Sequence, residues 1–413
     1  MKKQIRKVLV VNSGSSSLKY QLINTKTEEV SAKGICERIG TDGALIDHKL
    51  LTKDLKVKEN HVMNNHADAL RVVVDKLLDA TYGCLSSMDE IEAVGHRVVH
   101  GGPYFSGSML LEGDVLDKLK LCNDFAPLHT PPAIMGIEGA LAVMPNKPQA
   151  LVFDTAFHQT MEPAAYMYAL PYEAYEKYGI RRYGFHGSSH RFVSAEMCKI
   201  LGKVEGTRIV TCHIGNGSSI SAVKDGKCVD TSMGFTPLAG VEMGTRCGDI
   251  DPAIVTLLME KMNLSTKEVN DLMNKKSGFL GLTGFSSDSR DLEAAISAGP
   301  SDPNYEKSKL AMDILSYQIK KYIGSYAAAM NGLDAIVFTA GLGENNPHLR
   351  EMVCENMEYY GIEIDKELNA KMLRQPNIVK LSTDQSKVAV YLIPTNEELV
   401  IARDTEALVN GTL

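Results

Sequence analysis

The chain has 413 residues, of which 44% are hydrophobic and 23% are charged. This composition is typical of a folded globular protein and excludes a disordered chain, a coiled coil and a collagen-like fibre. Acidic side chains outnumber basic ones by 51 to 44, which gives a net charge of −7. Proteins that bind a nucleic-acid backbone usually carry a basic excess, so nucleic acid is not expected as a partner. At about 150 residues per domain, the length predicts two domains.

The eight cysteines are scattered, and no Cys-x-x-Cys pair occurs among them. Several lie in apolar runs, as Cys212 does, which predicts buried free thiols in a reducing cytoplasm. The apolar run Val8–Val11 is too short for the core of a signal peptide. No stretch approaches the roughly 18 apolar residues of a membrane span. We therefore expect a cytoplasmic protein without membrane association.

The first predicted elements form a strand, a polar turn and a second strand. Val8–Val11 is a short apolar run typical of a buried strand, and Leu18–Ile23 alternates apolar and polar residues. The same pattern returns half a chain later, where Ile209–Ile214 and Ile220–Val223 flank a turn of glycine, asparagine and serine. This repeat predicts two domains of related topology, each opening with a hairpin.

The two turns can be compared residue by residue. Gly14 is matched with Gly217, and the Ser15-Ser16 pair with Ser218-Ser219. The match is short, so the repeat rests mainly on the shared order of strand, turn and strand.

Helical patterns and further strand runs fill the rest of the chain. Leu70–Leu78 has the spacing of an amphipathic helix, Tyr305–Met330 is a longer helix, and Asn396 is placed to cap a last one. Alternation of these helices with strands predicts an α/β fold. The remaining predicted strands are Ala150–Phe153, Ala335–Thr339 and Val388–Ile393.

Glycine-rich turns are the first candidate binding elements. Small residues leave backbone N–H groups uncovered, and such groups can form an anion site. Each turn alone is also explained as a plain hairpin turn. A third segment, Phe338–Asn345, ends a strand in Gly341-x-Gly343, but the Rossmann and P-loop spacings are absent. Together the three segments favour a phosphate site built from two hairpins.

Two arginines lie beside glycines. Arg97 precedes a Gly-Gly turn near the end of a short strand, and Arg246 lies in a glycine-rich loop. A guanidinium group suits phosphate and carboxylate because it donates at two points. For Arg246, a structural ion pair with Asp249 or Asp251 is an equally good explanation.

Histidines are frequent in the middle of the chain. His129 and His186 lie in proline- or glycine-rich loops, which favours a functional role, whereas His158 and His190 are predicted to be hydrogen-bonded structural residues. Their spacing beside carboxylates does not match a zinc site.

Two acidic residues lie at positions that favour function. Asp154 follows a strand, and α/β proteins collect catalytic groups at strand ends. Glu397 begins the last helix, where the helix dipole alone would explain a carboxylate and where Mg²⁺ could also be held.

Six segments together resemble the acetate kinase family, in the order expected and over Val8–Arg403. They are Asn12–Lys19, Gly95–Gly102, Phe153–His158, Tyr183–Gly187, His213–Gly217 and Gly244–Arg246.

The resemblance implies a fold and a reaction. Two duplicated α/β domains of the sugar-kinase, actin and heat-shock-ATPase type (ribonuclease H-like) would close on a nucleotide in a cleft between them. Residues 1–153 with 398–413 would form the first domain, and residues 154–397 the second, which carries most of the nucleotide site. The protein would be a homodimer that transfers a phosphoryl group reversibly from ATP to acetate, giving acetyl phosphate and ADP, with Mg²⁺ or alternatively Mn²⁺.

The resemblance also implies residue roles. Arg97 and Arg246 would hold the carboxylate and the transferring phosphoryl group. His186 would donate to the equatorial oxygens of that group, with His129 nearby. Asp154 would orient the substrate or the arginines.

The same resemblance implies three binding sets. Asn12 and Glu397 would hold the metal, directly or through water. The apolar pocket for the acetate methyl group would be formed by Val99, Leu128, Phe185 and Pro237. The ATP contacts would be Ser17, Lys19, His213, Asn216, Gly217, Asp288, Ser289, Arg290, Gly341, Leu342, Gly343 and Asn345.

Departures from the family pattern are mild and leave the size of the acceptor open. They are Thr130, Ser188, Cys247 and Glu162. A pocket edge that shifts by one methylene changes binding by about 1–3 kcal/mol, so a propionate or butyrate kinase is the nearest alternative. A kinase that uses pyrophosphate and a non-catalytic nucleotide switch are the more distant ones.

Overall fold

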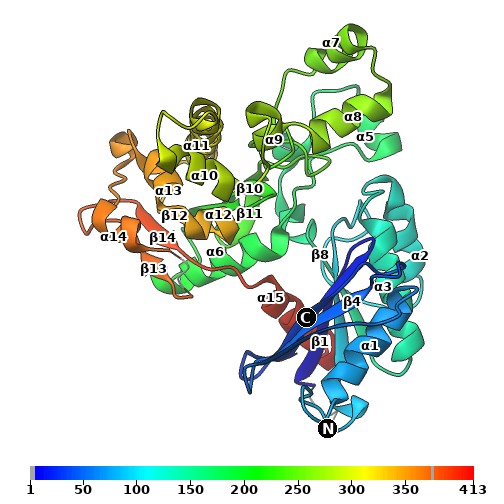
Figure 1. The fold of residues 1–413 in the computed structure, drawn as a ribbon. Coiled ribbons are helices and arrows are strands. Elements are labelled where there is room, and N and C mark those ends of the chain that lie inside the picture. Colours follow the sequence, from blue (N-terminus) through cyan, green and yellow to red (C-terminus); the bar gives the residue numbers. More distant parts are fainter. Residues whose placement is uncertain (1–4, 374–375) are drawn as a thin grey trace. The chain divides into compact units, whose positions relative to one another are not determined.

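The computed structural model describes residues 5–373 and 376–413. These residues form two compact units. Unit 1 contains the residues up to Phe157 together with Asn396–Leu413, and unit 2 contains His158–Thr395. Each unit is built around one β-sheet with helices packed on it (Figure 1), so the predicted α/β fold class is confirmed.

The sheet of unit 1 has eight strands in the order β5-β4-β3-β2-β1-β6-β8-β7. Strands β1 to β5 form an antiparallel meander, β1, β6 and β8 are parallel, and β7 is an antiparallel edge strand. The strands are β1 (Lys7–Ser13), β2 (Ser17–Asn24), β3 (Glu29–Glu37), β4 (Leu45–Leu50), β5 (Leu55–Asn60), β6 (Ala93–Val98), β7 (Met109–Leu110) and β8 (Gln149–Phe153).

The sheet of unit 2 has six strands in the order β11-β10-β9-β12-β14-β13. They are β9 (Arg208–Ile214), β10 (Ser218–Lys224), β11 (Lys227–Thr231), β12 (Ala335–Thr339), β13 (Val379–Lys380) and β14 (Ala389–Leu392). Strands β9, β10 and β11 are antiparallel, β9, β12 and β14 are parallel, and β13 is an antiparallel edge strand. This order repeats that of β3-β2-β1-β6-β8-β7, so the predicted duplication is present in the topology.

The two hairpins correspond in a different register from the predicted one. Ser13 pairs with Leu18 across the first turn, and Ile214 pairs with Ser218 across the second, which is one residue shorter. The ends of β1 and β9 therefore match Gly14 with Gly215. The predicted match of Gly14 with Gly217 is wrong, because Gly14 directly follows β1 whereas Gly217 directly precedes β10.

In unit 1, helices cover both faces of the sheet. Helices α1 (His66–Leu78) and α3 (Thr130–Val143) cover one face, where Leu9, Leu22 and Ile46 are buried. Helix α15 (Glu397–Asn410) lies against β1, β6 and β8 (Figure 1). As predicted, Asn396 caps α15: its Oδ1 accepts a hydrogen bond from the Leu399 N–H at 3.1 Å.

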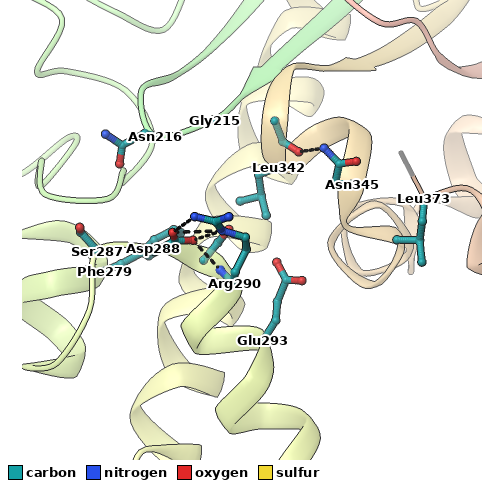
Figure 2. Close-up of a pocket in the computed structure, with 12 residues that line it drawn as sticks. Gly215, Asn216, Phe279, Ser287, Asp288, Arg290, Glu293, Leu342, Asn345 and Leu373 are labelled. Carbon is teal, nitrogen blue, oxygen red and sulfur yellow. Dashed lines mark hydrogen bonds and ion pairs between the residues drawn. The ribbon is translucent and has the colours of Figure 1, made fainter. Parts of the chain in front are cut away.

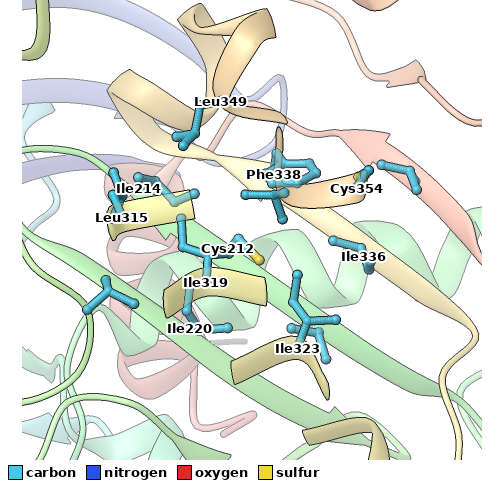
Figure 3. Packing of buried hydrophobic residues seen from close by; sticks show 14 of the residues in the cluster. Cys212, Ile214, Ile220, Leu315, Ile319, Ile323, Ile336, Phe338, Leu349 and Cys354 are labelled. Carbon is cyan, nitrogen blue, oxygen red and sulfur yellow. The ribbon is translucent and has the colours of Figure 1, made fainter. Parts of the chain in front are cut away.

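The core of unit 2 lies between its sheet and α11 (Tyr305–Met330), the long helix predicted from the sequence. Figure 3 shows Cys212 and Ile214 of β9 packed with Leu315 and Ile319 of α11. Helix α6 (Gly187–Leu201) lies on β9 and β12. His190 of α6 contacts Thr211 of β9. Because neighbouring residues of a strand point to opposite faces, Thr211 faces α6 while Cys212 faces α11.

The remaining helices are α2 (Val115–Lys120), α4 (Pro163–Tyr166), α5 (Tyr172–Tyr178), α7 (Ala253–Met262), α8 (Thr266–Lys275), α9 (Gly278–Thr283), α10 (Ser289–Ala298), α12 (Ala340–Asn345), α13 (Pro347–Cys354) and α14 (Lys366–Lys371). Short 3₁₀ helices occur at Met88–Glu90, Leu121–Asp124, Ala156–Thr160 and Glu358–Tyr360. All eight cysteines are free thiols, and six of them are buried. Within the described ranges, no helix is both long enough and apolar enough to cross a membrane.

Candidate functional site

In unit 1, the carboxyl ends of three parallel strands meet at one edge of the sheet. Val11 of β1 is paired with His96 of β6, and Arg97 of β6 with Val152 of β8. This register places Asn12, Arg97 and Asp154 at the same edge. It is the edge where open α/β sheets bind ligands.

Arg97 and Asp154 form a two-point ion pair. Arg97 Nε donates to Asp154 Oδ1 at 3.2 Å, and Arg97 Nη2 donates to Oδ2 at 2.7 Å. The Asp154 carboxylate is only 1% exposed. It raises the pKa of Arg97 above its ordinary value, although burial acts in the opposite direction. Asp154 therefore keeps the guanidinium charged and fixes its plane.

Glu397 reaches the same edge from the first turn of α15. Its Oε2 lies 3.9 Å from Arg97 Nη2. Burial raises the pKa of Glu397 to about 7, although Arg97 lowers it. The neighbouring Glu398 lines a pocket of about 410 Å³ together with Asn12 and Lys19.

In unit 2, His186 occupies the N-cap position of α6 with a left-handed backbone, φ 56°. Its Nδ1 lies 2.8 Å from Ser219 Oγ on β10. Its ring stacks on that of His213, with centroids 4.0 Å apart. Ring stacking and the serine contact hold the imidazole in one orientation.

Arg246 lies in the loop before α7. Its Nη1 donates to the Pro237 carbonyl at 3.0 Å, and burial lowers its pKa. In the part of the chain that the structure describes, no ion pair joins Arg246 to Asp249 or Asp251. The Asp249 carboxylate instead accepts hydrogen bonds from the Gly240 N–H and the Tyr322 hydroxyl. The predicted ion-pair alternative for Arg246 is therefore wrong.

Gly217 leaves a space that Arg246 and His186 share. A Cβ atom built on Gly217 would lie 3.4 Å from Arg246 Nη1 and 3.5 Å from His186 Nε2. A guanidinium N–H and an imidazole nitrogen therefore face the backbone of the second glycine-rich turn.

Unit 2 contains a pocket of about 940 Å³ (Figure 2), a volume within the range of small-molecule sites. It brings together seven of the residues predicted to bind ATP, on β9–β10, α10 and α12. They are Asn216, Asp288, Ser289, Arg290, Gly341, Leu342 and Asn345.

The walls of this pocket are held by local contacts. Asp288 caps α10 by accepting from the Arg290 N–H at 2.9 Å, and its carboxylate also pairs with the Arg290 side chain. Asn345 Nδ2 donates to the Gly341 carbonyl at 2.7 Å. A Cβ built on Gly341 would meet no atom within 4 Å, so the backbone of this glycine is open to a ligand.

The turn from β12 into α12 explains how Gly341 and Leu342 reach the pocket. Ala340 has a left-handed φ of 66°, which is unusual for a residue with a side chain. Its N–H donates to Glu344 Oε1 at 2.8 Å, and the same oxygen accepts from the Thr395 N–H at 3.2 Å. Glu344 thus joins the ends of β12 and β14.

The structure also gives the positions of the other predicted residues. Gly343 is a buried residue of α12, and its carbonyl accepts from Arg350 Nη1 at 2.9 Å. His129 is exposed at the N-terminus of α3, and the neighbouring Leu128 is 67% exposed. Lys19 is exposed, and Ser17 half-buried, on β2 of unit 1.

The four residues of the predicted methyl pocket are divided between the units. Val99 and Leu128 belong to unit 1, and Phe185 and Pro237 belong to unit 2. This pocket stays a prediction.

Five pocket residues were missed by the sequence analysis: Gly215, Phe279, Ser287, Glu293 and Leu373. Gly215 and Ser287 adjoin predicted residues, and Glu293 lies one helical turn after Ser289, a spacing that could have revealed it. Phe279 and Leu373 come from distant segments, and no local pattern marks them.

His158 and His190 are hydrogen-bonded and buried, as predicted. His158 Nε2 lies 2.9 Å from the Phe185 carbonyl oxygen. His190 contacts Thr211 and Ser219 through its two ring nitrogens.

The chain is similar to known kinases over nearly its full length. The model of the acetokinase family matches residues 7–403. Acetate kinases of Alkaliphilus metalliredigens and Fusobacterium nucleatum are each 54% identical, over 98% and 97% of this chain and 100% and 98% of their own.

Solved structures of two kinases are also similar to this chain over nearly its full length. The acetate kinase of Porphyromonas gingivalis has a TM-score of 0.93 at 46% identity, and a propionate kinase of Francisella tularensis has 0.89 at 39%. Both alignments cover 98% of this chain and 100% of the solved chain. The resemblance seen in six short segments is confirmed, and the chain belongs to the acetokinase family.

Proposed function

We propose that this protein is an acetate kinase that transfers the γ-phosphoryl group of ATP reversibly to acetate. The observation that carries this conclusion is the full-length similarity to curated acetate kinases at 54% identity. The identity to the Francisella propionate kinase is lower, at 39%, than that to the Porphyromonas acetate kinase, at 46%. Acetate is therefore favoured over longer acids.

Arg97 would bind the acetate carboxylate or the transferring phosphoryl group. A guanidinium group has five N–H donors, and Asp154 engages Nε and Nη2. The other donors keep a fixed plane for an anionic oxygen. Asp154 would act through the arginine.

His186 and Arg246 would stabilise the phosphoryl group during transfer. Phosphoryl transfer needs positioning and charge neutralisation more than covalent chemistry. Both side chains face the space at Gly217, where they can donate to equatorial oxygens. His129 would assist as predicted.

ATP would bind through the pocket of about 940 Å³ in unit 2. Leu342 and Phe279 offer apolar surface for the adenine ring, and Asp288, Ser289 and Arg290 offer polar groups for the ribose. The phosphates would extend along Asn216 and Gly217.

A divalent metal fits the donors at the carboxyl edge of the unit 1 sheet, and we assign Mg²⁺, with Mn²⁺ as a substitute. Asn12 and Glu397 offer an amide oxygen and a carboxylate, the hard oxygen ligands that Mg²⁺ prefers. When bound, the ion would neutralise charge on the phosphate oxygens. Eight free thiols also support a reducing, cytoplasmic location.

The activity is tested by incubating the protein with ATP, Mg²⁺ and acetate and trapping acetyl phosphate as the hydroxamate. Formation that depends on all three components supports the proposal, and its absence overturns it. Comparing kcat/KM for acetate, propionate and butyrate decides the acceptor.

The transfer would be direct, without a phosphoenzyme. ATP with a chiral γ-phosphoryl group distinguishes the two routes. One direct displacement inverts the configuration at phosphorus, and retention would show a covalent intermediate.

A homodimer is also proposed, and its contact surface would include α7. This helix has no buried residue, and Ile254, Leu257 and Met262 are exposed on it. A contiguous apolar surface usually marks an interaction site, and a second copy of the chain is the occupant we assign. Light scattering should give a dimer for the wild type and a monomer for Leu257→Glu. A monomeric wild type would contradict the assignment.

A further inference from the structure

A chain of hydrogen-bonding groups runs behind His186 into the interior of unit 2. His186 Nδ1 lies 2.8 Å from Ser219 Oγ, and the same oxygen lies 2.7 Å from His190 Nε2. His190 Nδ1 lies 2.7 Å from Thr211 Oγ1. Ser219, His190 and Thr211 are fully buried. The four groups form one continuous series from α6 through β10 and β9.

The number of protons in this series limits its arrangements. Among the described residues, the buried Ser219 Oγ contacts these two imidazoles, so its single proton has a partner only if it donates to one ring and accepts from the other. Burial lowers the pKa of His190 well below its ordinary value, so this ring is neutral and carries a single N–H. Only two directions of donation satisfy both histidines.

Thr211 distinguishes the two directions. In the first, the Thr211 hydroxyl donates to His190 Nδ1 at 2.7 Å, His190 Nε2–H donates to Ser219, and Ser219 donates to His186 Nδ1. In the second, all three bonds reverse, and the Thr211 hydroxyl is left with the Ser221 carbonyl at 3.5 Å. A buried donor with so long a bond costs about 1–3 kcal/mol. The first direction is therefore the more stable.

The first direction determines where His186 carries its proton. If Nδ1 accepts from Ser219, the neutral ring holds its proton on Nε2. Nε2 is the nitrogen that faces the space at Gly217, beside Arg246 Nη1. The ring then presents a donor to that space without being charged.

We infer that Ser219 and His190 are positioning residues that hold His186 as the neutral tautomer protonated on Nε2. The use of that N–H as a donor to the transferring phosphoryl group rests on the proposed function. The tautomer itself is a property of the protein without substrate, so it can be measured independently.

The first test is ¹⁵N–¹H correlation NMR on the full chain labelled at histidine, recorded above the pH at which imidazole titrates. The His186 signals are assigned by their loss in His186→Gln. The wild type should show the proton on Nε2. Ser219→Ala should give a mixture of tautomers, and Ser219→Thr, which keeps the hydroxyl, should restore the wild-type pattern.

Steady-state kinetics give the second test. Ser219→Ala should lower kcat by about 10- to 100-fold and leave both KM values within a few-fold, and Ser219→Thr should recover most of the loss. Ser194→Ala is the matched control. It removes a buried serine hydroxyl on α6, which among the described residues donates to the Arg191 carbonyl of its own helix, and it should change neither readout.

A wild-type proton on Nδ1, or a Ser219→Ala variant with wild-type tautomer and kcat, overturns the inference. Failure of the proposed function has a different signature, because the wild type would then form no acetyl phosphate while the tautomer of the free protein could still be read.

Discussion

Arg97 and Asp154, at the ends of neighbouring parallel strands, meet in a two-point ion pair in which Nη2 lies 2.7 Å from Oδ2. The guanidinium is 23% exposed and the carboxylate 1%, so the pair presents the positive charge outward. A cation is thereby fixed at the sheet edge of a protein whose net charge is −7.

Asp154→Asn should impair both the orientation of Arg97 and the stability of the fold. The amide keeps the shape but loses the charge that holds the guanidinium plane, so kcat should fall by about 100-fold or more. Breaking a buried pair costs about 3–5 kcal/mol, and thermal unfolding should shift accordingly. Asp384→Asn, at an exposed pair with Lys380, is the control and should change neither value. Near-wild-type kcat for Asp154→Asn would refute the role.

Arg246→Lys should lower kcat by about 100-fold or more while the fold is kept. Lysine retains the charge but cannot reproduce the guanidinium fork, whose Nη1 donates to the Pro237 carbonyl and lies beside Gly217. Initial rates measure the loss of kcat, and circular dichroism shows whether the fold is kept. A variant within a few-fold of wild type would show that charge alone is sufficient at this position.

Gly341→Phe should block the nucleotide pocket. No atom lies within 4 Å of a Cβ at this position, so a side chain would extend into space proposed for ATP. Calorimetric titration with ADP should show at least about a tenfold loss of affinity. Gly341→Ala is the matched control and should bind ADP almost as wild type does. Equal affinities in all three proteins would place the nucleotide elsewhere.

Glu242→Gln should change the dependence of stability on pH. Glu242 is buried, its Oε1 has no hydrogen-bond partner within the described residues, and burial raises its pKa to about 8. The unfolded carboxyl group titrates near 4.5. Between these values unfolding releases a proton, so rising pH destabilises the wild type by up to about 1.4 kcal/mol per pH unit.

The Glu242→Gln variant has no carboxyl group at this position, so its unfolding releases no proton from residue 242. Its unfolding midpoint should therefore exceed that of the wild type increasingly from pH 5 to pH 8, with no divergence below about pH 4.5. Glu138→Gln, an exposed carboxylate on α3, controls for loss of one charge. Parallel curves for wild type and Glu242→Gln would contradict the prediction.

Elements with strong local signals were predictable. Tyr305–Met330 is one helix, as predicted, and Asn396 caps α15. The matching of the two hairpins was not predictable residue by residue, because one turn is a residue shorter and sequence similarity cannot show where a strand ends.

The candidate site was predictable where residues are neighbours in the chain. Asn216 and the Asp288–Arg290 segment were implied by the family resemblance, whereas Phe279 and Leu373 join them only through the packing of distant segments. His190 was correctly predicted to be hydrogen-bonded. Its link to His186 through Ser219 depends on how α6 packs on β10, which no local pattern contains.

Gly95 on β6 allows α15 to approach the sheet closely, because a Cβ there would lie 2.4 Å from Thr405 Oγ1. Unit 1 is thus completed by a segment that follows unit 2 in the chain, whereas His158–Thr395 of unit 2 is continuous. Removal of α15 would therefore uncover the sheet of unit 1 and leave every residue of unit 2 in place.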